Sequence, residues 1–247
     1  MLITGGSRGL GREMALAIAE AGADVVLVAR DKDNLESAAD EIRQRGRRAD
    51  TIVCDVSQAD DCRIMCETAL RDFGPIDILI NNAGGRRFNV PTEQYPLEQW
   101  QQILDLNLTS TFICTKHIGG AMIARGTGGR VINIASMSGM IVNRDIGGRS
   151  YEASKGAVIQ FTKATATDWA KHGITVNAIC PGVFMTDANK RWAKEQPEMM
   201  EMYRQLVPMC EFGTPEDLGP LAVYLASDAA RYMTGSAVVI DGGYTAW

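Results

Sequence analysis

A glycine-rich turn at the start of the chain restricts most strongly what this sequence can fold into. Thr4-Gly5-Gly6-Ser7-Arg8-Gly9-Leu10-Gly11 follows a short apolar run and precedes a helical pattern that Gly22 ends. Asp24–Arg30 is then an almost wholly apolar second strand. A strand, a glycine turn, a helix and a strand within about 30 residues form a dinucleotide-binding unit, in which phosphate approaches backbone N–H groups at the positive end of the helix.

The same alternation of strands and helices continues to the end of the chain. Further strands are expected at Asp50–Asp55, Ile76–Ile80, Arg130–Ala135, Ile174–Ile179 and Ala237–Ile240. Further helices are expected at Leu35–Arg45, Gln58–Phe73, Trp100–Arg125, Tyr151–His172 and Glu216–Ala226. This order predicts an α/β fold of the Rossmann type: one doubly wound parallel sheet of about seven strands with helices on both faces. No linker or low-complexity tract interrupts it, so residues 1–247 are expected to form a single domain.

Composition excludes several classes of partner. A hydrophobic share of 46% and a charged share of 22% over 247 residues allow a sizeable core. The net charge of -5 argues against a nucleic-acid partner. No apolar run approaches the ~20 residues of a membrane span, and no signal peptide precedes the first motif. A small-molecule substrate, with no membrane partner, is therefore expected.

The cysteines carry no obvious metal motif. The six cysteines, at positions 54, 62, 66, 114, 180 and 210, include no CxxC pair, and the chain has only two histidines. Cys62 and Cys66 share a helix face but have no third ligand nearby in the sequence, so we expect no metal site. The cysteines are predicted to be buried, reduced thiols of a cytoplasmic protein.

Tyr151 and Lys155 are the candidate proton-transfer pair. Four residues apart, they lie on one face of the expected helix, one turn from each other. Free tyrosine ionises near pH ~10, which is too high for efficient proton transfer at neutral pH. A nearby ammonium favours phenolate, so Lys155 is expected to lower the pKa of Tyr151 into a useful range.

Further motifs lie in order along the chain. They are Thr4-Gly5-(x)3-Gly9-x-Gly11, Asp55-Val56, Asn81-Asn82-Ala83-Gly84, the set Asn107, Ser136, Tyr151 and Lys155, and Pro181-Gly182-(x)3-Thr186. In these motifs the sequence resembles the short-chain dehydrogenase/reductase family over essentially its whole length. The resemblance implies hydride transfer with a nicotinamide cofactor and the catalytic residues Asn107, Ser136, Tyr151 and Lys155. It also implies the cofactor-binding residues Gly5, Ser7, Arg8, Gly9, Leu10, Arg30, Asp55, Val56, Asn82, Ala83, Gly84, Tyr151, Lys155, Pro181, Gly182, Val183 and Thr186.

The residue types suit that chemistry. When a carbonyl is reduced, its oxygen gains negative charge, so Ser136 can donate a hydrogen bond to it and Tyr151 can deliver the proton. By the resemblance, Lys155 also holds the ribose hydroxyls. Asn107 could bind a water that relays protons to Lys155. Ser138 competes with Ser136, which we favour because it directly follows its strand.

Two arginines favour NADP(H) over NAD(H). A site specific for NAD usually has an acidic residue at the end of the second strand. Here Ala29 takes that place, followed by Arg30, and Arg8 is a second cation suited to a 2′-phosphate. Asp31 could serve as the missing acid, with Arg30 pointing to solvent. NADP(H) is favoured and NAD(H) stays open.

The expected substrate rim is rich in arginine. Arg86, Arg87, Arg144 and Arg149, with Trp192, suggest an anionic or highly hydroxylated substrate such as a sugar acid or polyol. Surface arginines without that role are an equal alternative. Segment 184–212 contains Met199, Met200, Met202 and Met209, which suit a substrate lid and equally an ordinary core.

The leading functional hypothesis is therefore NAD(P)(H)-dependent interconversion of a secondary alcohol and a ketone. An alternative is reduction of a 3-oxoacyl thioester on an acyl carrier protein. A non-catalytic nucleotide-sensing regulator is a third, against which the complete catalytic set argues. The resemblance also implies a homotetramer or homodimer with helices Trp100–Arg125 and Tyr151–His172 at one interface. Family members carry residues before the first strand, which here begins at Met1, so we expect a trimmed or displaced start.

Overall fold

The structure, a computed structural model, describes residues 1–143 and 146–247. Arg144, one of the arginines expected at the substrate rim, lies outside the described residues.

Seven parallel strands form one sheet in the order β3-β2-β1-β4-β5-β6-β7. They are β1 (Leu2–Thr4), β2 (Val25–Ala29), β3 (Ala49–Val53), β4 (Ile78–Asn81), β5 (Gly129–Ile134), β6 (Ile174–Pro181) and β7 (Ala237–Ile240). The chain runs outward from β1 to β3 and then crosses to β4 on the other side of β1. Ile3 is accordingly paired with Leu27 on one side and Ile80 on the other. Sheets of this topology bind ligands in the crevice outside the carboxyl ends of the strands at such a reversal, which here lies between β1 and β4.

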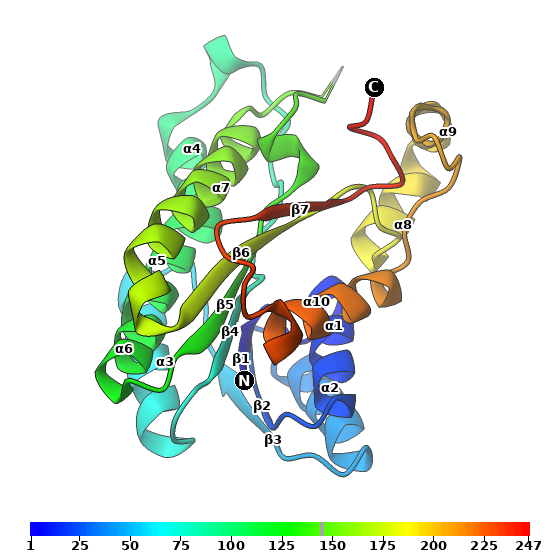
Figure 1. Ribbon diagram of the computed structural model, residues 1–247. Helices are drawn as coiled ribbons and strands as arrows, with labels where there is room; N and C mark the ends of the chain where they lie inside the picture. Colours follow the sequence, from blue (N-terminus) through cyan, green and yellow to red (C-terminus); the bar gives the residue numbers. More distant parts are fainter. Residues whose placement is uncertain (144–145) are drawn as a thin grey trace.

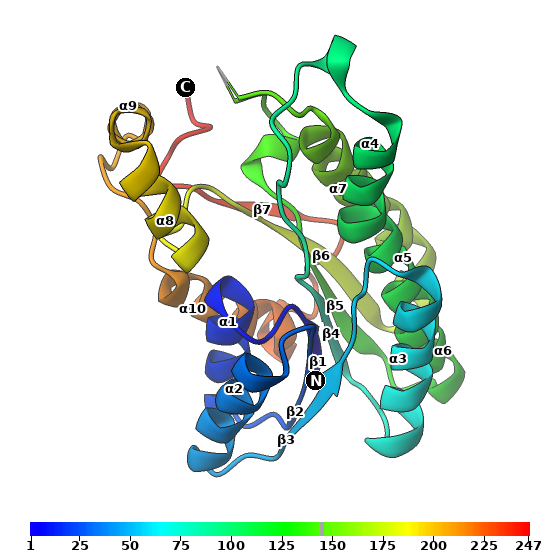
Figure 2. The same ribbon diagram turned by 180° about the vertical axis from the view of Figure 1, so that it is seen from behind.

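Helices cover both faces of the sheet (Figures 1 and 2). One face carries α1 (Gly9–Glu20), α2 (Lys32–Gln44) and α10 (Gly219–Ala226). The other carries α3 (Ala59–Asp72), α4 (Leu97–Leu104), α5 (Ser110–Cys114), α6 (Gly120–Arg125) and α7 (Ser150–Trp169). Alternate strand side chains enter opposite cores, since Ile3 packs with the first set of helices and Leu2 with the second. The predicted doubly wound sheet is confirmed.

The helix expected at Trp100–Arg125 is one continuous helical stretch from Leu97 to Arg125 with two π-helical segments. These are Asp105–Thr109, between α4 and α5, and Thr115–Gly119, between α5 and α6. Such segments bend a helix and are frequent at functional sites. The first contains Asn107.

Helices α8 (Asp187–Glu195) and α9 (Pro197–Leu206) form an excursion near the carboxyl edge of the sheet (Figure 1). Phe184 and Gly213 close its base by an isolated bridge. Met200 and Tyr203 are buried, whereas Met202 and Met209 are exposed. Short 3₁₀ helices lie at Thr92–Gln94, Met137–Gly139, Ala170–His172, Pro215–Leu218 and Asp228–Ala230.

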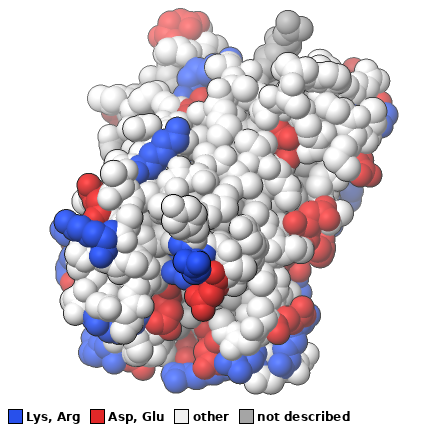
Figure 3. Space-filling model, viewed as in Figure 1, with Lys and Arg blue, Asp and Glu red and all other residues white. Residues whose placement is uncertain are grey.

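Charged side chains of both signs are interspersed on the face that Figure 3 shows. The local basic run after α2 follows this pattern: Arg45 pairs with Glu20 at 2.7 Å and Arg47 pairs with Asp24 at 2.8 Å. Within the part of the chain that the structure describes, every helix is too short or not apolar enough to cross a bilayer.

Candidate active site

The glycine turn between β1 and α1 forms a cradle for a phosphate. Gly9 opens α1 with φ of +54°, a conformation that favours glycine. A Cβ on Gly11 would overlap the carbonyl oxygen of Gly5, so the helix can approach the turn closely only without a side chain there. The free N–H groups of this 12-residue helix fit the diphosphate of a dinucleotide.

The end of β4 holds the cradle in place. Thr4 Oγ1 accepts hydrogen bonds from the backbone N–H of Asn82, at 3.1 Å, and of Ala83, at 3.0 Å. In return Asn82 Nδ2 donates to the carbonyl oxygens of Thr4 and Gly5 at 2.9 and 3.1 Å. Asn82, expected at the cofactor, thus uses its side-chain amide to fix the turn.

The segment after β6 reaches the same cradle. A Cβ on Gly9 would lie 3.4 Å from Thr186 Cγ2, so Thr186 borders the glycine turn across 177 residues of sequence. Thr186 caps α8 by accepting from the N–H of Asn189. Pro181 ends β6, and a Cβ on Gly182 would lie only 2.7 Å from Asp241 Cα. The structure therefore brings the predicted Pro181–Thr186 segment and the glycine turn together.

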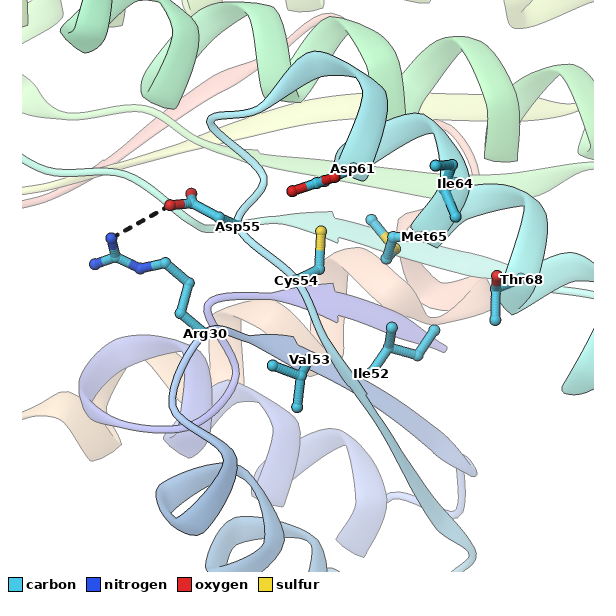
Figure 4. A pocket seen from close by; sticks show the side chains of 9 residues that line it. All are labelled: Arg30, Ile52, Val53, Cys54, Asp55, Asp61, Ile64, Met65 and Thr68. Carbon is cyan, nitrogen blue, oxygen red and sulfur yellow. Dashed lines mark hydrogen bonds and ion pairs between the residues drawn. The ribbon is translucent and has the colours of Figure 1, made fainter.

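Arg30, which follows β2, and Asp55, which follows β3, lie beside each other (Figure 4). Arg30 Nη1 lies 3.5 Å from Asp55 Oδ2, and Ser57 donates to Asp55 Oδ1 from its backbone and its hydroxyl. They border a cavity of about 510 Å³ between β3 and α3 that also includes Cys54 and Met65. Val56, which follows Asp55, is buried.

Asp31 has a structural task of its own. Its carboxylate caps α2, accepting from the backbone N–H of Asn34 at 3.1 Å and from Asn34 Nδ2 at 2.6 Å. These hydrogen bonds, together with the charge of Arg8, lower the pKa of Asp31. Arg8 and Arg30 are both exposed. Two exposed guanidiniums, one of them in a long ion pair with Asp55, thus lie near an acid that is already committed to a helix cap.

Ser136, Tyr151 and Lys155 meet at the carboxyl edge of β5. Ser136 directly follows the strand, and Tyr151 and Lys155 lie in the first two turns of α7. The Ser136 hydroxyl is close enough to the Tyr151 hydroxyl to lower its pKa. Lys155 is buried, and its Nζ donates to the carbonyl oxygen of Ile134 at 2.6 Å and lies 5.9 Å from the ring centroid of Tyr151.

The pKa of Tyr151 departs from the sequence expectation. Burial raises this pKa, and the hydrogen bond from Ser136 and the charge of Arg86 offset only part of the rise. The expected net lowering of this pKa is therefore wrong, because removing phenolate from water outweighs the effects of Ser136 and Arg86. Burial also lowers the pKa of Lys155 to about 8, so this amine loses its proton readily.

Asn107 ties two parts of the site together. Its Oδ1 accepts from the backbone N–H of Gly85 at 2.8 Å, and its Nδ2 donates to Ser154 Oγ at 3.0 Å. A Cβ on Gly84 would lie 2.8 Å from Asn107 Oδ1 and 3.1 Å from Lys155 Nζ, so Asn107 and Lys155 flank Gly84. The Asn107 side chain thus joins the loop after β4 to α7, and its role in binding a water stays a prediction. Sequence reasoning missed Ser154, although it lies inside the Tyr151–Lys155 motif.

Ser138 and Ser136 have different partners. Ser138 Oγ accepts from Asn143 Nδ2 at 2.7 Å, which holds the following loop. Ser136 Oγ accepts from the backbone N–H of Ser138 at 3.1 Å and also reaches Tyr151. Of the two serines, Ser136 is thus the one that acts on the tyrosine.

The expected arginine rim is partly neutralised by Glu152. Arg86 Nη2 and Arg149 Nη1 contact the same carboxylate oxygen at 2.6 and 3.2 Å. Arg87 is exposed, and Trp192 packs on Tyr203 in α8 and α9, with ring centroids 6.0 Å apart. Sequence reasoning missed Glu152, although it directly follows Tyr151, because a lone acid on a helix carries no motif.

Comparisons with known proteins agree with this geometry. Residues 5–245 match the family described as "Enoyl-(Acyl carrier protein) reductase". The chain is 38% identical to galactitol 2-dehydrogenase (L-tagatose-forming) of Cereibacter sphaeroides, over 99% of this chain and 94% of the relative. It is also 38% identical to a 3-oxoacyl-[acyl-carrier-protein] reductase of Synechocystis sp., over 98% and 95%.

One solved structure extends the likeness to the fold. Gluconate 5-dehydrogenase from Burkholderia cenocepacia, in complex with NADP and tartrate, superposes with a TM-score of 0.92 at 34% identity. The match covers 100% of this chain and 94% of that one. Together with the seven-stranded parallel sheet, these matches show that the chain is an oxidoreductase of the short-chain dehydrogenase/reductase family.

Proposed function

We propose that this protein is an NADP(H)-dependent dehydrogenase that interconverts a secondary alcohol and a ketone on a sugar acid or polyol. The meeting of Ser136, Tyr151 and buried Lys155 at the carboxyl edge of β5 is the observation that carries the proposal. A hydroxyl donor, a phenol and a lysine at the end of a parallel strand can polarise and protonate a carbonyl oxygen.

Each side chain then has one task. Bound nicotinamide supplies or accepts the hydride. Ser136 donates a hydrogen bond to the substrate oxygen, and Tyr151 delivers a proton from its hydroxyl during reduction and accepts one during oxidation. Lys155 holds the ribose hydroxyls through Nζ, while Asn107 fixes the loop after β4 against α7.

The preference for NADP(H) rests on Arg8, Arg30 and Asp31. The two exposed guanidiniums can pair with a 2′-phosphate, and the carboxylate that could bind a 2′-hydroxyl is committed to Asn34. A similar protein, the gluconate 5-dehydrogenase of B. cenocepacia, was solved with NADP. The adenosine half would lie toward Asp55 and Val56.

The substrate class rests on the site and on the relatives. Arg86 and Arg149 beside Tyr151 offer donors for hydroxyl or carboxylate groups, and Glu152 offers an acceptor. Two similar proteins are named for galactitol and gluconate, and one of them was solved with tartrate, a hydroxylated carboxylate. Segment 184–212, closed at its base by Phe184 and Gly213, would cover the substrate as a lid.

The test is turnover of purified protein, followed by cofactor absorbance, with NADP⁺ and with NAD⁺ against hexitols and hexonates. We expect oxidation of at least one hexitol or hexonate, with a higher kcat/KM for NADP⁺. Absence of turnover on the whole panel, with NADP⁺ bound, would refute the substrate class and leave the reaction class in place. Absence of cofactor binding would refute both.

Reduction of a 3-oxoacyl thioester is the second candidate. It is favoured by the 38% identity with a 3-oxoacyl-[acyl-carrier-protein] reductase. The same assay run with NADPH and acetoacetyl thioesters separates the two proposals, because a thioester reductase would reduce these substrates and oxidise no sugar alcohol.

A further inference from the structure

Three thiols meet in the core between α3 and the helical stretch that carries α5. Cys62 and Cys66 lie one turn apart on α3, and Cys114 ends α5. Their three Sγ atoms all lie within 4.8 Å of one another, and those of Cys62 and Cys114 are 3.5 Å apart. The sequence expectation that Cys62 and Cys66 have no third ligand nearby is therefore wrong, because packing of the two helices brings Cys114 to them.

We propose that Cys62, Cys66 and Cys114 form a binding site for one thiophilic d¹⁰ cation, Zn²⁺ or Cu⁺. The site is separate from the nicotinamide crevice. It joins α3 to α5, which β4, the loop after it and α4 separate along the chain.

The sulfur positions suit a shared ion. Zinc–thiolate bonds of about 2.3 Å in tetrahedral geometry hold two sulfurs about 3.8 Å apart. The observed triangle, with one edge of 3.5 Å and all edges within 4.8 Å, needs only small shifts of the side chains to reach that spacing. Three sulfur ligands select Zn²⁺ and Cu⁺ over hard cations such as Mg²⁺.

The position of Cys62 in its helix favours the thiolate form of this residue. Cys62 lies in the first turn of α3, where the positive helix end stabilises a thiolate. All three side chains are buried, at 0, 0 and 1% exposure, so a bound ion would be shielded from water and from exchange.

His117 distinguishes the two cations. It follows Cys114 by three residues on the same helical stretch and is partly exposed. Structural Zn²⁺ takes four ligands, so zinc would require His117 or another fourth donor, whereas Cu⁺ is satisfied by thiolates alone.

The test starts from full-length protein that has been reduced and freed of metal. Titration with Co²⁺, as a spectroscopic substitute for Zn²⁺, should produce thiolate-to-cobalt charge-transfer absorption that saturates at one equivalent and is reversed by Zn²⁺. A parallel titration with Cu⁺ against a chromophoric chelator covers the second cation. Failure of both metals to bind at one equivalent overturns the proposal without any variant.

Variants assign the ligands. Cys62→Ala, Cys66→Ala and Cys114→Ala should each lose stoichiometric binding. Cys54→Ala, which removes a buried thiol outside the triangle, and Cys210→Ala, which removes an exposed one, should keep it. Binding that survives all three ligand variants, or that is lost equally with Cys54→Ala, would overturn the assignment. Weaker Zn²⁺ binding in His117→Ala, with Cu⁺ binding unchanged, would support the three-thiolate site with His117 as fourth donor for zinc.

Discussion

The guanidinium of Arg86 lies over the ring of Tyr151, with 4.7 Å between Arg86 Cζ and the ring centroid. Arg86 is held there by Glu152 at 2.6 Å and by the carbonyl oxygen of Gly147 at 2.8 Å. Its positive charge lowers the pKa of Tyr151 against the opposing effect of burial. A residue expected only at the substrate rim is thus an electrostatic partner of the proposed proton donor.

Arg86→Ala should raise the pKa of Tyr151, because burial then acts with less opposition. The charge of Arg86 is one of the two effects that oppose burial at this hydroxyl. Oxidation needs the phenolate, so the rise of kcat/KM with pH in that direction should move to higher pH. Arg87→Ala, which removes an exposed arginine next in sequence, should leave the profile in place. An equal shift in both variants would contradict this role for Arg86.

Tyr151→Phe removes the hydroxyl that Ser136 contacts and should lower turnover by ~10²–10⁴-fold, the usual contribution of a positioned proton donor. Binding of NADPH, measured by fluorescence titration, should be unchanged because the ring stays in place. Tyr224→Phe, on the exposed surface of α10, is the matched control and should keep full activity. Loss of cofactor binding together with turnover would remove Tyr151 from the role of proton donor.

Arg30→Ala should weaken NADPH binding and spare NADH. Hydrogen bonds to a charged group contribute about 1.5–3 kcal/mol, so the Kd of NADPH should rise by roughly 10–100-fold. Folding should be unaffected, since the ion pair with Asp55 is exposed and long. Measured Kd values for both cofactors decide the matter; equal losses would mean that Arg30 does not recognise the 2′-phosphate.

Lys155 should make stability rise with pH. Its pKa is lowered to about 8 in the folded chain, against ~10.4 when unfolded, so the native state binds fewer protons between these values. Burial of the charged amine therefore lowers the free energy of unfolding most below pH about 8. Above that value the free energy of unfolding rises by up to about 1.4 kcal/mol per pH unit.

Lys155→Met removes this titration while keeping the length of the side chain. Urea unfolding of both proteins across pH about 7–10 should show the native protein gaining free energy of unfolding relative to the variant above pH about 8. Parallel curves over that range would show that Lys155 titrates normally in the folded chain.

Two glycine substitutions should act in opposite directions. Gly11→Ala would place a Cβ against the carbonyl oxygen of Gly5 and should destabilise the fold by ~1–3 kcal/mol. Gly120→Ala, in α6, meets nothing within 4 Å and should stabilise it by ~0.5–1 kcal/mol. Thermal unfolding of each variant measures both effects. A neutral Gly11→Ala would mean that the turn can open without cost.

Local sequence was sufficient for the elements and for the motifs at their ends. The alternation of apolar runs and helical patterns predicted all seven strands, because the central strands of a parallel sheet are covered on both faces and are therefore largely apolar. Gly5, Gly9 and Gly11 predicted the turn, because only glycine permits its backbone and its close approach to β4.

Tertiary structure decided what surrounds these residues. Packing of different elements buries Tyr151 and so raises its pKa. It also places Arg86 and Arg149 on the same carboxylate of Glu152, and it brings Asn107 to Ser154. The solvent exposure of these side chains and the charges beside them depend on packing across the edge of the sheet, which the spacing of residues in the sequence does not specify.

The sequence by itself therefore determined the fold, the family and the place of the cofactor turn, because these depend on periodicity and on residues that no other side chain can replace. Only the tertiary structure decided the electrostatic setting of Tyr151 and the meeting of Cys62, Cys66 and Cys114. Both depend on which side chains converge from distant segments, and the physical cause of that convergence is helix packing on a common sheet.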